Sequence, residues 1–170
     1  KLLTKRKQRY INNSSDLNQF DITVSNNFDQ FYDILVKNKK KYKSEPTHSL
    51  DELIKLKKLF PVEFVLLVST YQKKVVGGSL LLFANNKVSL VFYNVVLDSF
   101  RSSQLSMYQL YKCMELSKKR GALVVDFGVS HTPEQNNPLA PKFSLIQFKE
   151  QLGALGVVRT IFKKDFNFDK

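Results

Sequence analysis

The chain has 170 residues and a formal net charge of +12, with 43% hydrophobic and 25% charged residues. This length supports one domain with its own core, and the composition is that of a globular protein. No apolar run approaches the roughly 20 residues that span a bilayer, and the N-terminus shows no secretory signal. We therefore expect a cytoplasmic protein without a transmembrane segment. The positive charge favours an anionic partner such as nucleic acid, acidic lipid or a phosphorylated cofactor.

Cysteine and histidine are scarce, with one Cys and two His in the whole chain. These numbers exclude an intramolecular disulfide framework and a cysteine-based zinc cluster, and they disfavour a histidine-rich metal site. Cys113 falls within a helical apolar pattern, so we interpret it as a core residue rather than a nucleophile. No metal site is predicted, and no glycine loop of the Walker or dinucleotide-binding type is present.

Residues 1–18 form a basic lead-in without an initiator Met, from which we expect a longer chain with an upstream domain. Residues 19–170 are predicted to form a single domain. Its first half begins with a strand over 19–25 and continues with two helices over 26–42 and 46–61. The second of these helices opens with a capping box, Ser49 with Glu52, and ends at Pro61.

Three strands should follow as an antiparallel meander, because short polar links separate runs rich in Val, Leu and aromatic residues. Their ranges are 62–71, 75–84 and 88–97. The pair Gly77-Gly78 inside the second run predicts a bulge or a close backbone approach.

The second half alternates helices and strands. A helix over 101–120 places Leu105, Tyr108, Tyr111 and Met114 on one face and stops at Gly121. A short buried strand, a polar loop, a helix and a final strand follow, over 122–127, 129–141, 141–153 and 156–166. This order predicts an α/β (α+β) fold, with a mixed, mostly antiparallel sheet and helices on both faces.

The order of elements and four stretches of sequence resemble one known superfamily. The stretches read "EPTHSLDELIKLKKLFP", "VVGGSLLLFANNKVSLVFYN", "VDFGVSHTPEQNN" and "FKEQLGA", and they begin at residues 45, 75, 125 and 148. Together they resemble the Fem-like branch of the GNAT acyltransferases, which includes peptidoglycan peptidyl transferases and acetyltransferases of polysaccharide clusters. Many such proteins carry two GNAT-like domains, and this chain resembles the C-terminal one.

The resemblance implies a site for acetyl-CoA or another acyl-CoA. GNAT enzymes hold the pyrophosphate on backbone amides at the N-terminus of the long helix, in the pattern R/Q-x-x-G-x-G/A, where free N–H groups and the helix dipole favour anions. The matching window runs from Arg101 to Ser106, and its cofactor-binding candidates are Arg101, Ser102, Ser103 and Gln104. Gln104 and Ser106 replace the two glycines, which also permits a plain helix cap beside an exposed arginine.

The resemblance also implies attack of an amine on a carbonyl carbon, which needs a base, oxyanion donors and an acid. The catalytic candidates are Tyr93 on the predicted fourth strand, Asp126 at the end of the fifth strand and His131 in the loop after it. The amides around 93–95 are the oxyanion candidates. An alternative interpretation makes Tyr93 a core residue, Asp126 a turn residue and His131 a solvated one.

Three further residues are substrate-binding candidates: His48 before the capping serine, Gly128 after the fifth strand and Lys149 on the helix that follows. Gly128 would let the backbone turn sharply beside a substrate. For His48 and Lys149, local structural roles remain the alternative.

Three functions stay open. The chain is expected to be an N-acyltransferase domain that transfers an acyl group from acyl-CoA to an amine, on an amino sugar or a cell-envelope precursor. It can instead be a Fem-like peptidyl transferase that uses aminoacyl-tRNA, which the positive charge favours. The third alternative is a non-catalytic, GNAT-shaped binding or scaffold domain, which the replaced glycines favour.

Overall fold

The computed structural model describes residues 3–5, 8–9, 11, 15–131 and 140–158. Its sheet has five strands in the order β1-β2-β3-β4-β5. Neighbouring strands are antiparallel from β1 to β4, whereas β5 is parallel to β4. The strands are β1 (Phe20–Ser25), β2 (Phe64–Tyr71), β3 (Lys74–Phe83), β4 (Val88–Val96) and β5 (Val124–Asp126). The predicted mixed, mostly antiparallel sheet is confirmed.

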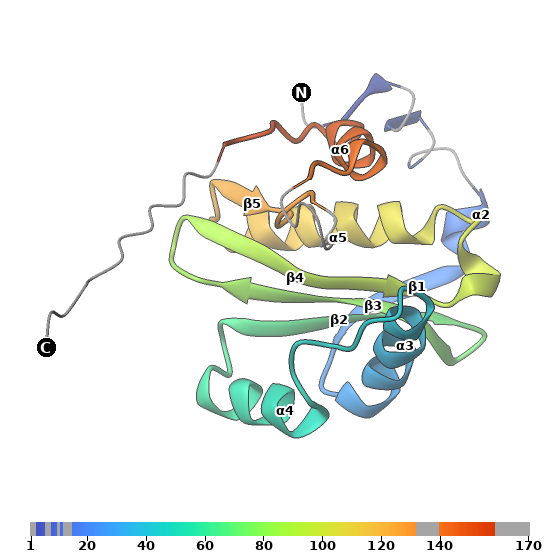
Figure 1. Cartoon of the computed structure of the whole chain (residues 1–170), viewed down its shortest axis with the longest axis vertical. Helices are drawn as coiled ribbons and strands as arrows, with labels where there is room; N and C mark the ends of the chain where they lie inside the picture. The colour runs from blue at the N-terminus through green and yellow to red at the C-terminus, as the bar shows by residue number, and fades with distance from the viewer. Residues whose placement is uncertain (1–2, 6–7, 10, 12–14, 132–139, 159–170) are drawn as a thin grey trace, which may run out of the picture.

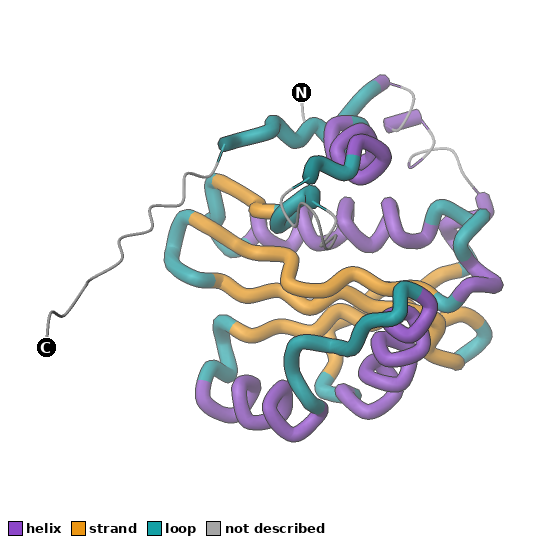
Figure 2. Tube along the Cα trace, viewed as in Figure 1, coloured by secondary structure: helices purple, strands orange, loops and turns teal. Residues whose placement is uncertain are grey.

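Helices cover both faces of this sheet, as predicted (Figure 1, Figure 2). On one face lie α3 (Phe28–Lys41) and α4 (Leu50–Leu59), and on the other lies α5 (Leu105–Lys119), with α6 (Phe143–Glu150) above it. A short α2 (Ser15–Asn18) precedes β1, and a single 3-10 turn, η1 (Asp98–Phe100), links β4 to α5. No helix among the described residues is long and apolar enough to cross a membrane.

The face under α3 and α4 holds the main core cluster, in which the rings of Phe28 and Phe31 and the side chain of Leu53 are buried against β2, β3 and β4. The helix start that carries Leu53 is fixed by the predicted capping box, since Ser49 and Glu52 each satisfy the other's backbone N–H. The two helices predicted for the first half and the three-strand meander are confirmed in their main extent.

The Gly77-Gly78 pair lies where backbones approach closely, as predicted. A Cβ at Gly77 would come within 2.7 Å of the Val95 carbonyl oxygen, and one at Gly78 within 2.7 Å of the Leu67 carbonyl oxygen. The strand register also shifts beside this pair, between Ser69 and Thr70 of β2. Both parts of the expectation, a bulge and a close approach, are met.

The face under α5 is more polar than its sequence pattern indicates. Tyr108, Tyr111 and Met114 are only partly buried, whereas Gln109 and Ser117 are fully buried. The Gln109 amide donates to Ser69 Oγ at 3.0 Å and to the Val95 carbonyl at 3.3 Å, and Ser117 pairs with Ser89 at 2.7 Å. The face of α5 that is buried thus differs from the predicted one. Polar residues, Gln109 and Ser117, take part in the buried interface because their side chains are hydrogen-bonded to the sheet.

Cys113 lies in this same interface and is buried, as predicted. Burial raises the pKa of its thiol to about 12, so the group stays protonated near neutral pH.

Three boundaries differ from the prediction. The long helix begins at Leu105 rather than at 101, because 101–104 form turns. The helix predicted over 141–153 covers Phe143–Glu150. Of the predicted last strand, residues 156–158 are not in a strand, and 159–166 lie outside the described residues.

Candidate functional site

The sheet opens between β4 and β5. Their parallel pairing joins Val88, Ser89 and Leu90 to Val124, Val125 and Asp126, and it stops there. β4 continues to Val96, so its edge beyond Leu90 has no partner strand within the described residues. The amides 93–95, which are the oxyanion candidates, thus lie beyond the paired part of β4, and their role stays a prediction.

A bulge lies at the point where the two strands part. In the β3–β4 register, Leu80 faces Tyr93 whereas Leu81 faces Val91, which leaves Phe92 as the extra residue. Farther along, the Leu97 N–H donates to the Val76 carbonyl on β3. Because backbone groups alternate along an antiparallel strand, the N–H of Asn94 faces the open side. Among the amides 93–95, that of Asn94 is the one placed for an oxyanion.

Tyr93 and His48 lie together on the α3–α4 side of β4. The Thr47 N–H donates to the Tyr93 hydroxyl at 3.1 Å, and the Tyr93 ring is 9% exposed beneath the segment 42–49. The ring of Phe92 contacts both neighbours, with centroids 4.8 Å from Tyr93 and 5.3 Å from His48. The Nδ1 atom of His48 is buried and has no hydrogen-bond partner among the residues that the structure describes. The fold thus brings two predicted site residues together from positions 45 residues apart in the sequence.

The loop before α5 keeps an unusual backbone. Gln104, the N-cap, has φ of +59° and ψ of 16°, a left-handed conformation that disfavours residues other than glycine. It occupies the position of the first glycine in the acyl-CoA pattern. A glutamine thus adopts at this position a conformation that glycine takes more readily, at a cost on the order of 1 kcal/mol.

Two of the predicted cofactor residues already have partners within the chain. Arg101 donates to the Tyr42 hydroxyl at 2.7 Å, and its Nε lies 3.3 Å from an Asp98 carboxylate oxygen. Ser103 donates to the Phe100 carbonyl at 2.6 Å. The start of α5 is held by Asn94, whose amide donates to the Ser106 carbonyl and hydroxyl. Sequence reasoning missed Asn94, although a lone amide in the apolar run "VFYNVV" is a visible signal.

The residues after β5 form one hydrogen-bonded unit, which we name the β5 brace: Asp126, Gly128, Val129, Ser130 and Lys149. Asp126 accepts the Gly128 N–H at 2.7 Å, and Gly128 has φ of +70°. Lys149 donates to the Gly128 carbonyl at 2.8 Å, to the Val129 carbonyl at 2.9 Å and to the Ser130 hydroxyl at 2.8 Å. Burial lowers the pKa of Lys149, and the charge of Asp126 partly offsets this effect. These contacts match the alternative interpretation, in which Asp126 is a turn residue and Lys149 has a local structural role. Roles of Asp126, Gly128 and Lys149 in catalysis or substrate binding stay predictions.

His131 lies in the segment between β5 and α6, at the start of the predicted loop. It forms an isolated antiparallel bridge with Pro141, and residues 132–139 between them lie outside the described residues. Its assignment to proton transfer remains a prediction. No group of three or more metal-ligating side chains occurs among the described residues.

Comparisons with known proteins bear on the fold. No family model matches the chain, and no curated protein matches its sequence. A possible acetyltransferase from Clostridium difficile 630 is similar in structure, with a TM-score of 0.63 and 14% identity over 87% of this chain and 98% of that one. An aminoglycoside N-acetyltransferase, AAC(6')-Iy, in complex with CoA has a TM-score of 0.61 and 14% identity, covering 86% and 94% of the two chains.

The chain has the GNAT fold. A transcriptional regulator from Bacillus halodurans C-125 is equally similar, with a TM-score of 0.62 and 14% identity over 86% of this chain and 99% of that one. At such identities the likeness is one of fold, and a fold hosts more than one function. The chemistry must therefore be argued from the site.

Proposed function

We propose that this chain is an N-acyltransferase domain that transfers an acyl group from acyl-CoA to an amine. The observation that supports it most is the opening between β4 and β5, which leads to the N-terminus of α5. A helix N-terminus has N–H groups without helical partners and a positive dipole, and Gln104 at this one has a left-handed backbone.

The residues of this loop fit an acyl-CoA pyrophosphate. Arg101, Ser102 and Ser103 would hold it together with the first amides of α5, because guanidinium and hydroxyl groups are strong donors to phosphate. The present partners of Arg101, Asp98 and Tyr42, are exposed, and its own side chain is 53% exposed. Exposed ion pairs contribute about 0–1 kcal/mol, so exchange of Asp98 for a phosphate costs little.

The proton transfers would fall to Tyr93 on β4 and to His48 in the segment before α4. Bound acyl-CoA would supply a thioester: the amine would add to its carbonyl carbon to form the C–N bond, and the C–S bond would then break to release the thiol of CoA. The Asn94 N–H would stabilise the negative charge on the carbonyl oxygen. His48 would accept the proton that the ammonium group loses, and Tyr93 would donate one to the leaving sulfur. Support for a shared site comes from the contact of both rings with Phe92.

The residues at the end of β5 and after it have smaller roles in this proposal. Asp126, with one oxygen used by Gly128, is a candidate anchor for the acceptor's ammonium group, beside Gly128 and Lys149. His131 is a second candidate for proton transfer. The acceptor is proposed to be an amino sugar or a cell-envelope precursor, as in the Fem-like branch, in the cytoplasm and together with an upstream domain.

The direct test is release of free thiol from acetyl-CoA in the presence of small amines, for wild type and for Tyr93→Phe. Tyr111→Phe, on the exposed side of α5, is the matched control. Loss of a general acid lowers rates by about 10²–10⁴-fold, so we expect kcat to fall by at least about 10² in the first variant only. Equal rates for the two variants would contradict the role of Tyr93, and absence of both thiol release and CoA binding would contradict the function.

Two alternatives have their own support. Residues other than glycine at 104 and 106, and the internal partners of Arg101, favour a non-catalytic binding domain. The net charge of +12 favours a Fem-like transferase that uses aminoacyl-tRNA. Binding of tRNA with steep salt dependence, without CoA binding, would select the second of these, and binding of neither would select the first.

A further inference from the structure

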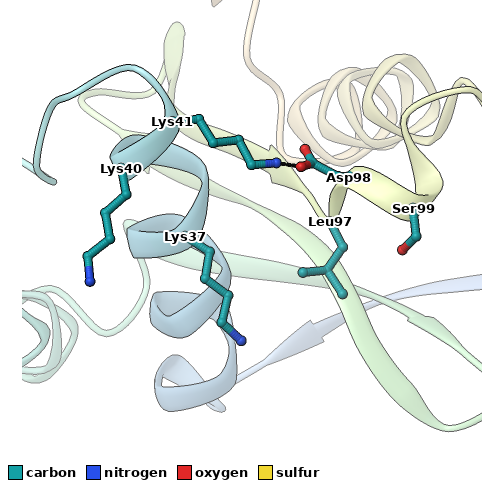
Figure 3. A pocket seen from close by; sticks show the side chains of 6 residues that line it. All are labelled: Lys37, Lys40, Lys41, Leu97, Asp98 and Ser99. Atoms are coloured by element: carbon teal, nitrogen blue, oxygen red, sulfur yellow. Dashed lines mark ion pairs between the residues drawn. The ribbon is translucent and has the colours of Figure 1, made fainter.

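A basic groove lies between α3 and the end of β4. It is open, has a volume of about 470 Å³ and is lined by Lys37, Lys40, Lys41, Leu97, Asp98 and Ser99. Figure 3 shows Lys37 and Lys41 extending from α3 toward the strand end, with Lys40 on the outer side. Leu97 is the apolar residue of this lining. Three of the other five residues are lysines, so most of the polar groups that line the groove are ammonium groups.

The charges in this groove are unbalanced. Asp98, its one carboxylate, is shared by Lys41 and by Arg101 from the loop before α5. Lys37 and Lys40 have no ion-pair partner among the described residues, although Asp33 lies one turn before Lys37. Two cations are thus left without a counter-charge beside a hydroxyl group, that of Ser99.

The helix end alone does not account for this arrangement. Lysines in the last turn of α3 complement the negative end of the helix dipole, and this explains Lys39, Lys40 and Lys41. Lys37 lies a full turn earlier and still lines the groove. Lys37 therefore extends the positive charge beyond the last turn, while Lys40 points to the outer side of α3.

The groove adjoins the proposed acceptor side of β4. Lys39, on the same two turns of α3, lies over the ring of Tyr93 at 5.9 Å. Leu97 follows Tyr93 by four residues, which is about 13 Å along a strand. A substrate of sugar size, met by an extended lysine side chain, can span this distance with its amine near Tyr93.

From this geometry we infer that the acceptor amine also carries a phosphate, which Lys37 and Ser99 bind in the groove while Lys40 adds to its positive charge. The inference rests on the proposed acyl transfer and names its substrate class. Lysine ammonium groups and a hydroxyl are donors suited to phosphate, and a dianion balances the two unpaired cations. A polycationic amine would meet repulsion at the same place.

The test compares glucosamine with glucosamine phosphate, which differ only in the phosphate on the primary hydroxyl. Acetyl-CoA is the donor, and spermidine is the polycationic probe. The test variant is Lys37→Glu with Lys40→Glu. The control is Lys118→Glu with Lys119→Glu, the same charge change in the last turn of α5, about 20 Å of helix away from its start. Calorimetric Kd values for both sugars and for CoA are measured beside kcat/KM.

We expect wild type and control to prefer glucosamine phosphate by about tenfold in kcat/KM or in Kd, as one charge-assisted contact provides. The test variant should lose this preference, with its Kd for CoA unchanged. Equal use of the two sugars by wild type, a preference for spermidine, or a preference retained by the test variant would each overturn the inference. Equal weakening of CoA binding would assign the groove to the phosphates of CoA and overturn it as well.

The binding arm separates this inference from the function on which it rests. If no amine releases thiol but glucosamine phosphate still binds wild type more tightly than the test variant, the groove stands and acyl transfer fails. If acyl transfer proceeds without discrimination between the sugars, acyl transfer stands and the groove fails.

Discussion

The two strands that border the opening are held in different ways. β4 has nine residues and pairs with β3 along most of its length, and Asn94 ties it to α5 on one face while Tyr93 is covered on the other. β5 has three residues, all at least partly exposed, and depends on the brace centred on Lys149. The first wall of the opening, β4, is thus held mainly by strand pairing. The second wall, β5, depends more on hydrogen bonds to one half-buried cation, Lys149. Of the two main groups proposed for proton transfer, Tyr93 is on the first wall, and His48 lies in the segment before α4, in contact with Phe92 of that wall.

The largest effect is expected on the β4 side, at Gly78→Ala. A Cβ there would lie 2.7 Å from the Leu67 carbonyl oxygen and 2.9 Å from the Phe31 ring, in the middle of the sheet. Overpacking of this kind lowers the free energy of unfolding by about 1–3 kcal/mol. Urea denaturation measures it, with Gly156→Ala as control, because nothing lies within 4 Å of a Cβ at that position. Equal stability of the two variants would show that the centre of the sheet yields more easily than described.

On the β5 side, Lys149→Met should have a smaller and more local effect. It removes three hydrogen bonds donated by an ammonium group, two of them to carbonyls of exposed residues that water can reach, and we expect a loss of about 1–2 kcal/mol. Amide exchange should accelerate over 124–130 and remain unchanged over 64–83, since the hydrogen bonds of the Lys149 ammonium group all go to residues 128–130. Acceleration in both regions would mean that the two walls unfold as one unit.

The smallest effect concerns the capping box, which anchors the segment that covers Tyr93. Ser49→Ala should lower the free energy of unfolding by about 1 kcal/mol.

Hydrogen bonds from Ser49 lower the pKa of Glu52 below its usual 4.5. A lowered carboxyl pKa stabilises the fold above the unfolded-state value, and this contribution is lost as pH falls through the folded-state value. Stability measured from pH 6 downward should therefore fall less steeply in Glu52→Gln than in wild type, and parallel curves would contradict the assignment.

Local patterns in the sequence were sufficient for the fold. Alternation, turn residues and the Ser49–Glu52 cap predict the element order, because each signal lies within a few residues. The left-handed Gln104 carries no such signal, since only the surrounding loop forces that conformation on a glutamine. The buried Gln109 was missed for a related reason: its partners, Ser69 and Val95, come from distant strands.

The candidate site was predictable in its members more than in its contacts. Tyr93 and His48 were named from the sequence, but their common neighbour Phe92 is set by a bulge that no local pattern indicates. The partners of Arg101 were equally hidden, because Tyr42 lies 59 residues away in the sequence. Lys37 was overlooked because the lysines beside it have a sufficient explanation in the helix dipole.

Calorimetric titration with CoA tests the central claim most directly, namely that the opening and the start of α5 bind acyl-CoA. Wild type, Arg101→Ala and the control Lys118→Ala are compared at two salt concentrations. We predict micromolar binding by wild type and control, weakened about tenfold in Arg101→Ala, as expected for the loss of one charge-assisted contact to phosphate. No binding at millimolar CoA, or equal binding by all three proteins, would contradict the claim.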